Sequence, residues 1–269
     1  MNPLAKHMAA GTILLGAAAA ASSACVHDNS SLFIKMVLAP PSVTQGMNCT
    51  FTNDPTQMEI SRGTLDIDFQ AGYQATFLVG NQLVPQGDPT KPTTETSRIS
   101  LTGGIVRITD TSGHEIKKFS EATSGTIDPL SGTNPGYLAV LGFPLLDVAT
   151  VQGMAASLGD PTSLAPRPIV ELDTYVRFYG YTLGGQYVES GEFEFPVDVC
   201  MGCLVSFSAA STNPAEALPN CNGSSASTTA GVTVPCGLED FGIDCSLCGT
   251  NDIYCNPHPP IGTVDAGAD

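Results

Sequence analysis

The chain has 269 residues, of which only 13% are charged, and its formal net charge is −16. It contains 28 glycines and 20 prolines, a composition that favours turns and excludes coiled coils, collagen and long charged helices. Ten Lys and Arg residues against 26 Asp and Glu residues also argue against nucleic acid as a partner, because phosphate binding needs clustered basic side chains.

Residues 1–24 have the features of a secretory signal peptide. Lys6 is the only charged side chain before Asp28, and the run from Met8 to Ala21 that follows it is apolar or small. This run is shorter and richer in alanine than a transmembrane helix, and small residues end it. We therefore expect residues 1–24 to direct export and then to be removed.

The small residues Ser23 and Ala24 before Cys25 resemble a bacterial lipobox, in which the cysteine is diacylated and becomes the mature N-terminus. Ser22 stands where that pattern prefers leucine, so ordinary cleavage after Ala24, followed by secretion, is the alternative. The chain has nine cysteines, and assigning Cys25 to lipid leaves an even number for disulfides in an oxidising compartment. We expect residues 25–31 to be a lipid-anchored linker.

Lipid on Cys25 would make the membrane a partner and place the protein in the cell envelope. Val26 follows the cysteine, where an aspartate tends to retain lipoproteins at the inner membrane in some bacteria. The expected location is therefore the outer membrane, and both a periplasmic and a surface-facing orientation fit.

Residues 32–199 are expected to form an antiparallel β-sandwich of immunoglobulin-like character. Apolar and polar residues alternate in short runs separated by Gly, Asn, Asp and Pro, which is typical of half-buried strands. The first such runs are residues 32–38, 64–69, 73–79, 99–101 and 105–108, and the chain turns at residues 110–113.

A long hairpin is expected between residues 170 and 199, with a turn at Gly184 and Gly185. Its first strand has an apolar face formed by Val170, Leu172, Val176 and Phe178. Its second strand is expected to have an apolar face formed by Tyr187, Phe193, Phe195, Val197 and Val199, with a bulge at Gly191. One apolar face on each strand implies packing against a second sheet.

One short helix is expected between the strands. Asp147 is a suitable N-cap for a segment in which Val148, Val151, Ala155 and Leu158 follow helical spacing, and Gly159-Asp160-Pro161 would end it. We expect this helix to connect two strands rather than to form a layer.

Residues 200–256 form a cysteine-rich module with the spacing C-x2-C-x17-C-x14-C-x8-C-x2-C-x6-C. Its middle is rich in Ser, Thr, Gly and Asn, with too few apolar side chains for a core of its own, so disulfides are needed. The parity of the cysteines indicates that one from the sandwich joins the module. The residues expected to be oxidised are Cys49, Cys200, Cys203, Cys221, Cys236, Cys245, Cys248 and Cys255, with their pairing left open.

Two other interpretations of the module compete with structural disulfides. The pairs Cys200/Cys203 and Cys245/Cys248 have the spacing of a zinc site, but export favours disulfides, so no metal or cofactor is expected. Redox chemistry would need a thiolate stabilised at a helix N-terminus, whereas Cys200 follows a strand. Calcium at the acidic residues of the module is a further alternative to a solvated surface. These residues are Glu239, Asp240, Asp244 and Asp252.

The sequence contains no recognisable catalytic motif. His114 begins a zincin-like pattern, but Lys118 stands where the second histidine is required, so a solvated histidine at a turn is the preferred interpretation. Four tyrosines cluster around the predicted hairpin, where cross-strand pairing is preferred over an exposed binding patch. They are Tyr175, Tyr179, Tyr181 and Tyr187.

Three segments carry a resemblance to a known group of proteins. They are the Ser-Ser-Ala-Cys25 start, the strand end Phe77–Leu83 and the stretch from Tyr181 to Val205 with its Cys-x2-Cys ending. These segments resemble uncharacterised myxobacterial exported lipoproteins. The resemblance implies an envelope location and no known activity, so it adds no catalytic residue.

The sequence therefore predicts a non-catalytic envelope lipoprotein, a component for binding, adhesion or envelope assembly, with a protein or glycan as the possible partner. The alternative is a secreted hydrolase that uses paired carboxylates. Residues 257–269 are expected to be a flexible acidic tail.

Overall fold

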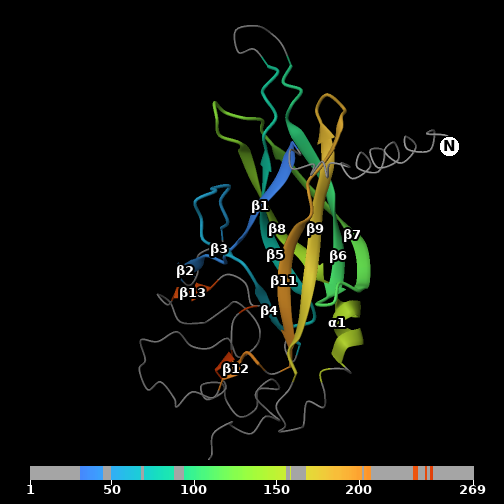
Figure 1. Cartoon of the computed structure of the whole chain (residues 1–269). Helices are drawn as coiled ribbons and strands as arrows, with labels where there is room; N and C mark the ends of the chain where they lie inside the picture. Colours follow the sequence, from blue (N-terminus) through green and yellow to red (C-terminus); the bar gives the residue numbers. More distant parts are fainter. Residues whose placement is uncertain are drawn as a thin grey trace, which may run out of the picture.

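The computed structural model describes residues 31–44, 50–67, 70–87, 94–155, 158, 168–201, 203–206, 233–235, 240 and 243–244. These residues form two large β-sheets that pack face to face (Figure 1). The prediction of a mainly β, two-sheet sandwich is confirmed. In the described part of the chain, no helix is both long enough and apolar enough to cross a membrane.

The first sheet has four strands. In spatial order they are β3 (Glu59–Ile60), β1 (Leu32–Leu38), β5 (Tyr73–Asn81) and β8 (Gly136–Leu146). All their pairings are antiparallel. Strand β1 has the bounds that the sequence predicts, and β5 continues two residues beyond the predicted run.

The second sheet has five strands in a row and a sixth paired at one side. The row is β4 (Gly63–Asp66), β11 (Phe193–Cys200), β9 (Val170–Thr182), β6 (Ile99–Asp110) and β7 (Glu115–Ile127), and β10 (Tyr187–Glu189) pairs with β9. The expectation of wholly antiparallel pairing is wrong at β4 and β11, which run parallel. Parallel strands cannot be joined by a tight turn, and these two lie more than a hundred residues apart in the chain.

Two small two-stranded sheets involve the C-terminal segment, and one of them joins it to an earlier part of the chain. Strand β13 (Thr233–Pro235) pairs with β2 (Ser42–Thr44), and β12 (Val205–Ser206) pairs with β14 (Ile243–Asp244). The β2–β13 pair brings the C-terminal segment to a short strand that belongs to neither large sheet and lies a few residues before Cys49.

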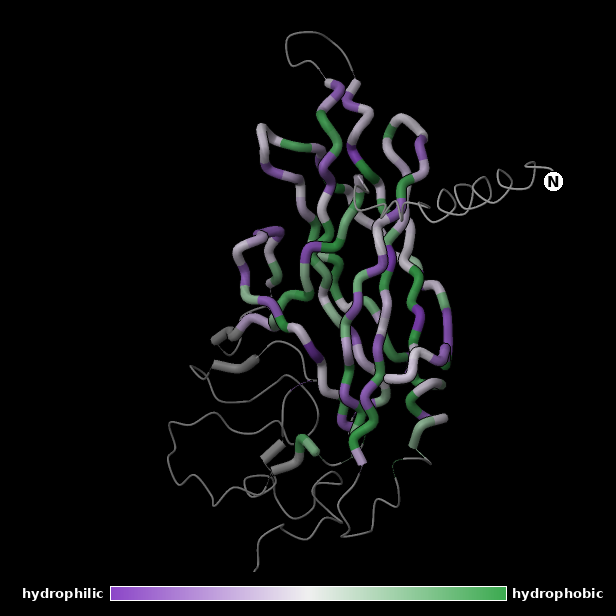
Figure 2. Tube along the Cα trace, in the orientation of Figure 1, coloured by the Kyte–Doolittle hydropathy of each residue, from purple (hydrophilic) through white to green (hydrophobic). Residues whose placement is uncertain are grey.

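The core lies between the two large sheets. Figure 2 shows hydrophobic and hydrophilic residues alternating along the strands, as expected for sheets with one buried face. Phe77 of β5 is fully buried and makes edge-to-face contacts with Phe143 and Phe178, so it joins both sheets at the centre of the core. Gly104 of β6 is required here, because a Cβ atom at this position would lie 2.6 Å from the ring of Phe143.

Strand β6 is continuous through Gly103 and Gly104, with a bulge between Leu101 and Gly103. The sequence predicts two separate runs here. The two glycines interrupt the alternation of apolar and polar residues, but they do not end the strand, because β6 is paired with β7 on one side and with β9 on the other.

The hairpin is largely as predicted. The N–H of Thr182 donates to the carbonyl of Gln186, and Gly185 adopts a φ of 84°, so the turn needs a glycine. One detail is wrong: the side chain of Tyr187 points outward and Val188 is buried instead. The alternation of inward and outward side chains shifts by one residue near Gly191. Phe195, Val197 and Val199 are therefore buried, as predicted.

Helix α1 (Val148–Ala155) follows β8 directly, and its cap is the predicted Asp147. The Asp147 Oδ1 atom accepts the backbone N–H of Thr150 at 3.0 Å, which is a typical N-cap bond. The helix connects β8 to β9 and forms no layer, as the sequence predicts.

Candidate functional site

Two regions of the described chain contain side chains with chemistry beyond core packing. One is the junction between the sandwich and the C-terminal segment. The other is the outer face of the six-stranded sheet.

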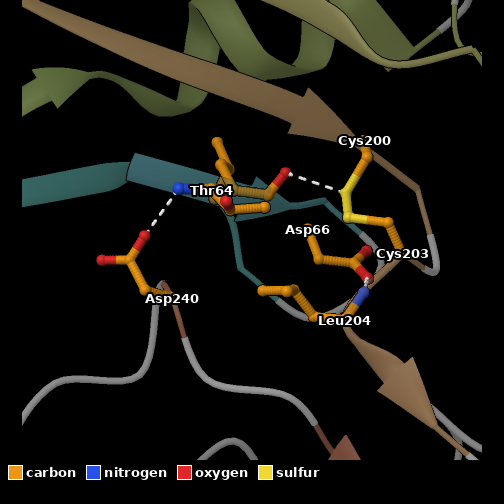
Figure 3. The surroundings of a disulfide bond; sticks show 7 residues. Thr64, Asp66, Cys200, Cys203, Leu204 and Asp240 are labelled. Carbon is orange, nitrogen blue, oxygen red and sulfur yellow. Dashed lines mark hydrogen bonds between the residues drawn. A yellow bond between two sulfur atoms is a disulfide. The ribbon is translucent and has the colours of Figure 1, made fainter. Parts of the chain in front are cut away.

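A disulfide between Cys200 and Cys203 lies at the junction (Figure 3). Cys200 is the last residue of β11 and is buried, whereas Cys203 is exposed. The Cys200 Sγ atom lies 3.6 Å from the carbonyl oxygen of Leu65 on the parallel strand β4. The disulfide therefore closes a short turn at the point where the chain leaves the sandwich.

Asp66 lies beside this disulfide and was not predicted from the sequence. It is fully buried at the end of β4, and its Oδ2 atom accepts the backbone N–H of Leu204 at 2.9 Å (Figure 3). A buried carboxylate needs such donors because the charge has lost its water. Its bond to Leu204 fixes the first residues after the disulfide against the edge of the sheet.

The carboxylate of Asp66 and the sulfur atoms of Cys200 and Cys203 lie within 4.8 Å of one another. These three groups are of the types that bind zinc, which needs thiolates rather than a disulfide. In the structure the two sulfur atoms are bonded to each other, so the arrangement here is a structural disulfide.

Asp240 connects the C-terminal segment to the sandwich. Its Oδ1 atom accepts the backbone N–H of Thr64 at 2.6 Å, and its Oδ2 atom accepts the hydroxyl of Tyr73 at 2.8 Å. Strand β4 is at the edge of its sheet, so the bond to Thr64 covers an edge N–H group that a foreign strand would otherwise pair with. The interpretation of Asp240 as part of a solvated acidic surface is therefore wrong.

The remaining cysteines of the prediction lie outside the described residues. They are Cys25, Cys49, Cys221, Cys236, Cys245, Cys248 and Cys255. The same holds for Glu239, Asp252 and the side chain of Asp244.

The four hairpin tyrosines lie on the outer face of the six-stranded sheet. The rings of Tyr179 and Tyr187 are stacked with centroids 6.4 Å apart, and the rings of Tyr181 and Tyr187 meet edge-on at 5.6 Å. This is the predicted cross-strand pairing. Tyr181 and Tyr187 nevertheless remain 48% and 49% exposed, so pairing and surface exposure coexist here.

Arginines and glutamates continue this face beyond the tyrosines. The guanidinium of Arg107 lies 4.1 Å from the ring centroid of Tyr175 and donates to Glu192 at 2.8 Å. Arg177 forms an ion pair with Glu189 at 2.7 Å. We call the six residues of this region the aromatic–ionic face: Arg107, Tyr175, Arg177, Tyr179, Glu189 and Glu192.

Two pKa shifts follow from these contacts. The hydrogen bond from Arg107 lowers the pKa of Glu192, despite partial burial, which acts in the opposite direction. Partial burial, followed by the hydrogen bond to Glu189, raises the pKa of Tyr187. Glu192 is thus held as an anion and the neighbouring Tyr187 as a neutral phenol, so the outer face of the sheet presents paired charges and hydroxyl groups at neutral pH.

Carboxylates also meet on the same sheet at Arg62, whose guanidinium binds both Glu171 and Asp198 at 2.7 Å. A paired-carboxylate hydrolase places its two acids on either side of a substrate, whereas both of these carboxylates are bound to one guanidinium. This pair therefore has the character of an ion-pair cluster.

His114 is exposed in the turn between β6 and β7. Its backbone N–H donates to the Asp110 Oδ1 atom at 2.9 Å. The predicted position at a hairpin turn is confirmed, and its contacts belong to the turn itself.

No protein-family model matches the sequence, and a comparison with curated proteins finds no similar sequence.

Proposed function

We propose that this chain is a non-catalytic lipoprotein of the cell envelope, located at the outer membrane, that binds a partner protein or glycan through an immunoglobulin-like β-sandwich. The signal-like residues 1–24 and the lipobox-like sequence before Cys25 support the location. The Cys200–Cys203 disulfide is compatible with an oxidising compartment.

The observation that carries the binding role is the aromatic–ionic face. Tyr175 and Tyr179 are planar, amphipathic groups on a rigid sheet, and Tyr and Arg are enriched at the energetic centres of interfaces. Arg107 and Arg177 are already ion-paired, so a partner would meet hydrogen-bonding groups fixed in place and few unpaired charges. Preorganised groups of this kind lose little entropy on binding.

Site-specific photocross-linking in cells tests this role. A photoreactive phenylalanine analogue at position 175 reports on the aromatic–ionic face, and the same analogue at Leu141, an exposed residue on β8 of the other sheet, is the control. We expect one discrete cross-linked product from position 175 and none from position 141. Identical patterns from both positions would refute the binding face.

A further inference from the structure

The start of the sandwich and the tip of the long hairpin lie at the same end of the molecule. Leu32, the first residue of β1, is in register with Asn81. The buried side-chain amide of Asn81 donates to the carbonyls of Ser97 and Ile127 in the segments of the other sheet, at 2.9 and 3.1 Å. We call this the anchor end (Figure 1).

The hairpin reaches the anchor end through its pairing with β6. Thr182, the last residue of β9, is in register with Ile99, the first residue of β6. Beyond Thr182, the N–H of Leu183 donates to the carbonyl of Arg98 at 2.8 Å. The turn is therefore fixed to the same end from which β1 starts.

Covalent geometry limits how far this end can lie from a lipid attached to Cys25. Seven residue steps separate Cys25 from Leu32, and a chain of that length spans at most about 25 Å. Strand β9 has 13 residues and is about 40 Å long. The anchor end is thus held close to the bilayer, while the opposite end can lie far from it.

Exposed apolar side chains gather on the hairpin at the anchor end. Tyr181, Leu183 and Tyr187 are each about half exposed, and we call them the tyrosine tip. Tyrosine is favoured at membrane interfaces because its ring is apolar and its hydroxyl remains hydrated. The hydroxyl of Tyr187 donates to Glu189 at 2.9 Å, so this ring can face lipid with its polar atom satisfied.

The acidic residues described around this end have partners. Asp128 is paired with Arg98 at 2.6 Å, and Glu189 is paired with Arg177. The Glu95 carboxylate accepts backbone N–H groups of Gly87 and Ser97. Two of these three carboxylates are offset by an arginine, so the described part of the anchor end has weaker repulsion from a lipid surface than the net charge of the whole chain implies.

We propose that the tyrosine tip lies in the interfacial region of the bilayer that carries the lipid on Cys25. This inference rests on the lipidation proposed above. The lipid and the tip form two contacts with one membrane. Together they orient the sandwich so that the Cys200–Cys203 junction points away from the bilayer.

The absence of tryptophan from the chain gives a direct test with single-tryptophan reporters. The mature chain, starting at Cys25→Ser, carries an N-terminal polyhistidine tag that tethers it to phosphatidylcholine vesicles containing a nickel-chelating lipid. This tether replaces the natural lipid, so the result does not depend on whether Cys25 is modified. The reporter is Leu183→Trp, and the control is Ile169→Trp, which is exposed just before β9 at the opposite end.

On tethering, we expect the emission of Leu183→Trp to shift to shorter wavelengths and to be quenched by brominated phosphatidylcholine, while Ile169→Trp stays unchanged. Adding Tyr181→Ser and Tyr187→Ser to the reporter should reduce the quenching. Equal behaviour of the two reporters, or quenching that the serine substitutions leave intact, would overturn the inference. A separate mass measurement of the natural N-terminus reports on lipidation alone, so the two failures are distinguishable.

Discussion

Asp147 joins local and tertiary contacts at the start of helix α1. It caps the helix through Thr150 and forms an ion pair with Lys117 on β7. Burial alone would raise its pKa, but the hydrogen bonds from Lys117 and Thr150 outweigh that effect and hold the pKa at about 2. Because the folded-state pKa is lowered, this carboxylate contributes stability above pH 4 that is lost as the pH falls towards 2.

We therefore predict that Asp147→Asn, which keeps a capping side chain but loses the charge, lowers the free energy of unfolding at pH 7. The shift from 3.8 to about 2 corresponds to about 2.5 kcal/mol. Solvent screening of a side chain that is 35% exposed reduces this to about 1 kcal/mol. Urea unfolding of both proteins at pH 7 and near pH 2 measures the difference, which should shrink at the lower pH.

Asp128→Asn is the matched control for this prediction. Asp128 also pairs with a basic side chain, Arg98, but it is 70% exposed, so its loss should cost no more than about 0.5 kcal/mol. A difference between wild type and Asp147→Asn that is the same at both pH values would contradict the assignment.

Tyr73 has a buried ring whose hydroxyl donates to Asp240. We predict that Tyr73→Phe keeps the core packing but loosens the C-terminal segment, because a hydrogen bond to a charged group contributes about 1.5–3 kcal/mol. Limited proteolysis should then cleave the region after Cys203 faster, while the sandwich fragment persists. The control is Tyr181→Phe, at a half-exposed ring of the tyrosine tip, and equal cleavage rates in the two variants would argue against the Asp240 contact.

At the scale of elements, we expect the disulfide at the end of β11 to separate two regions of different stability. The Cys200–Cys203 ring is small, so its chain-entropy contribution is only about 2 kcal/mol. The sandwich has a continuous core across both sheets. We predict that a dithiol reductant increases hydrogen exchange in residues 203–206 while leaving β9 protected. Simultaneous loss of protection in both regions would show that the disulfide stabilises the sandwich itself.

Local signals explain which elements could be predicted from the sequence. Strand β1 is a compact apolar run ended by two prolines, the hairpin turn carries two glycines, and helix α1 has an aspartate cap. No local pattern predicts strands β7 and β8. The edge strand β7 is exposed along most of its length and has no clean alternation, and β8 contains Gly142 and Pro144 within its apolar run.

The candidate sites were predictable to a lesser extent, because they depend on pairing between distant residues. The tyrosines could be placed at the hairpin since they lie close in sequence. The contact of Arg107 with Tyr175 follows from the register of β6 with β9, which no local pattern encodes. Nothing in the local sequence distinguishes Asp66 and Asp240 from the other acidic residues of the chain. Their roles depend on tertiary contacts, because Asp66 accepts the N–H of Leu204 and Asp240 accepts the N–H of Thr64.

At the scale of the whole molecule, the two ends of the sandwich differ in the proposed arrangement. One end of the sandwich carries the start of β1 and the tyrosine tip, and the other carries helix α1 and the Cys200–Cys203 junction (Figure 1). A lipid on Cys25 would hold the first end at the membrane. The aromatic–ionic face runs along the sheet away from that end, where a partner can reach it.

Lipid on Cys25 is the central claim of this account, and the mass of the mature N-terminal peptide tests it most directly. Protein isolated from its native membrane is digested, and the peptide that begins at residue 25 is analysed by mass spectrometry. We predict a diacylglyceryl-modified Cys25 at the N-terminus and loss of membrane association in Cys25→Ala. An N-terminal Cys25 without lipid, or a retained signal peptide, would contradict the account.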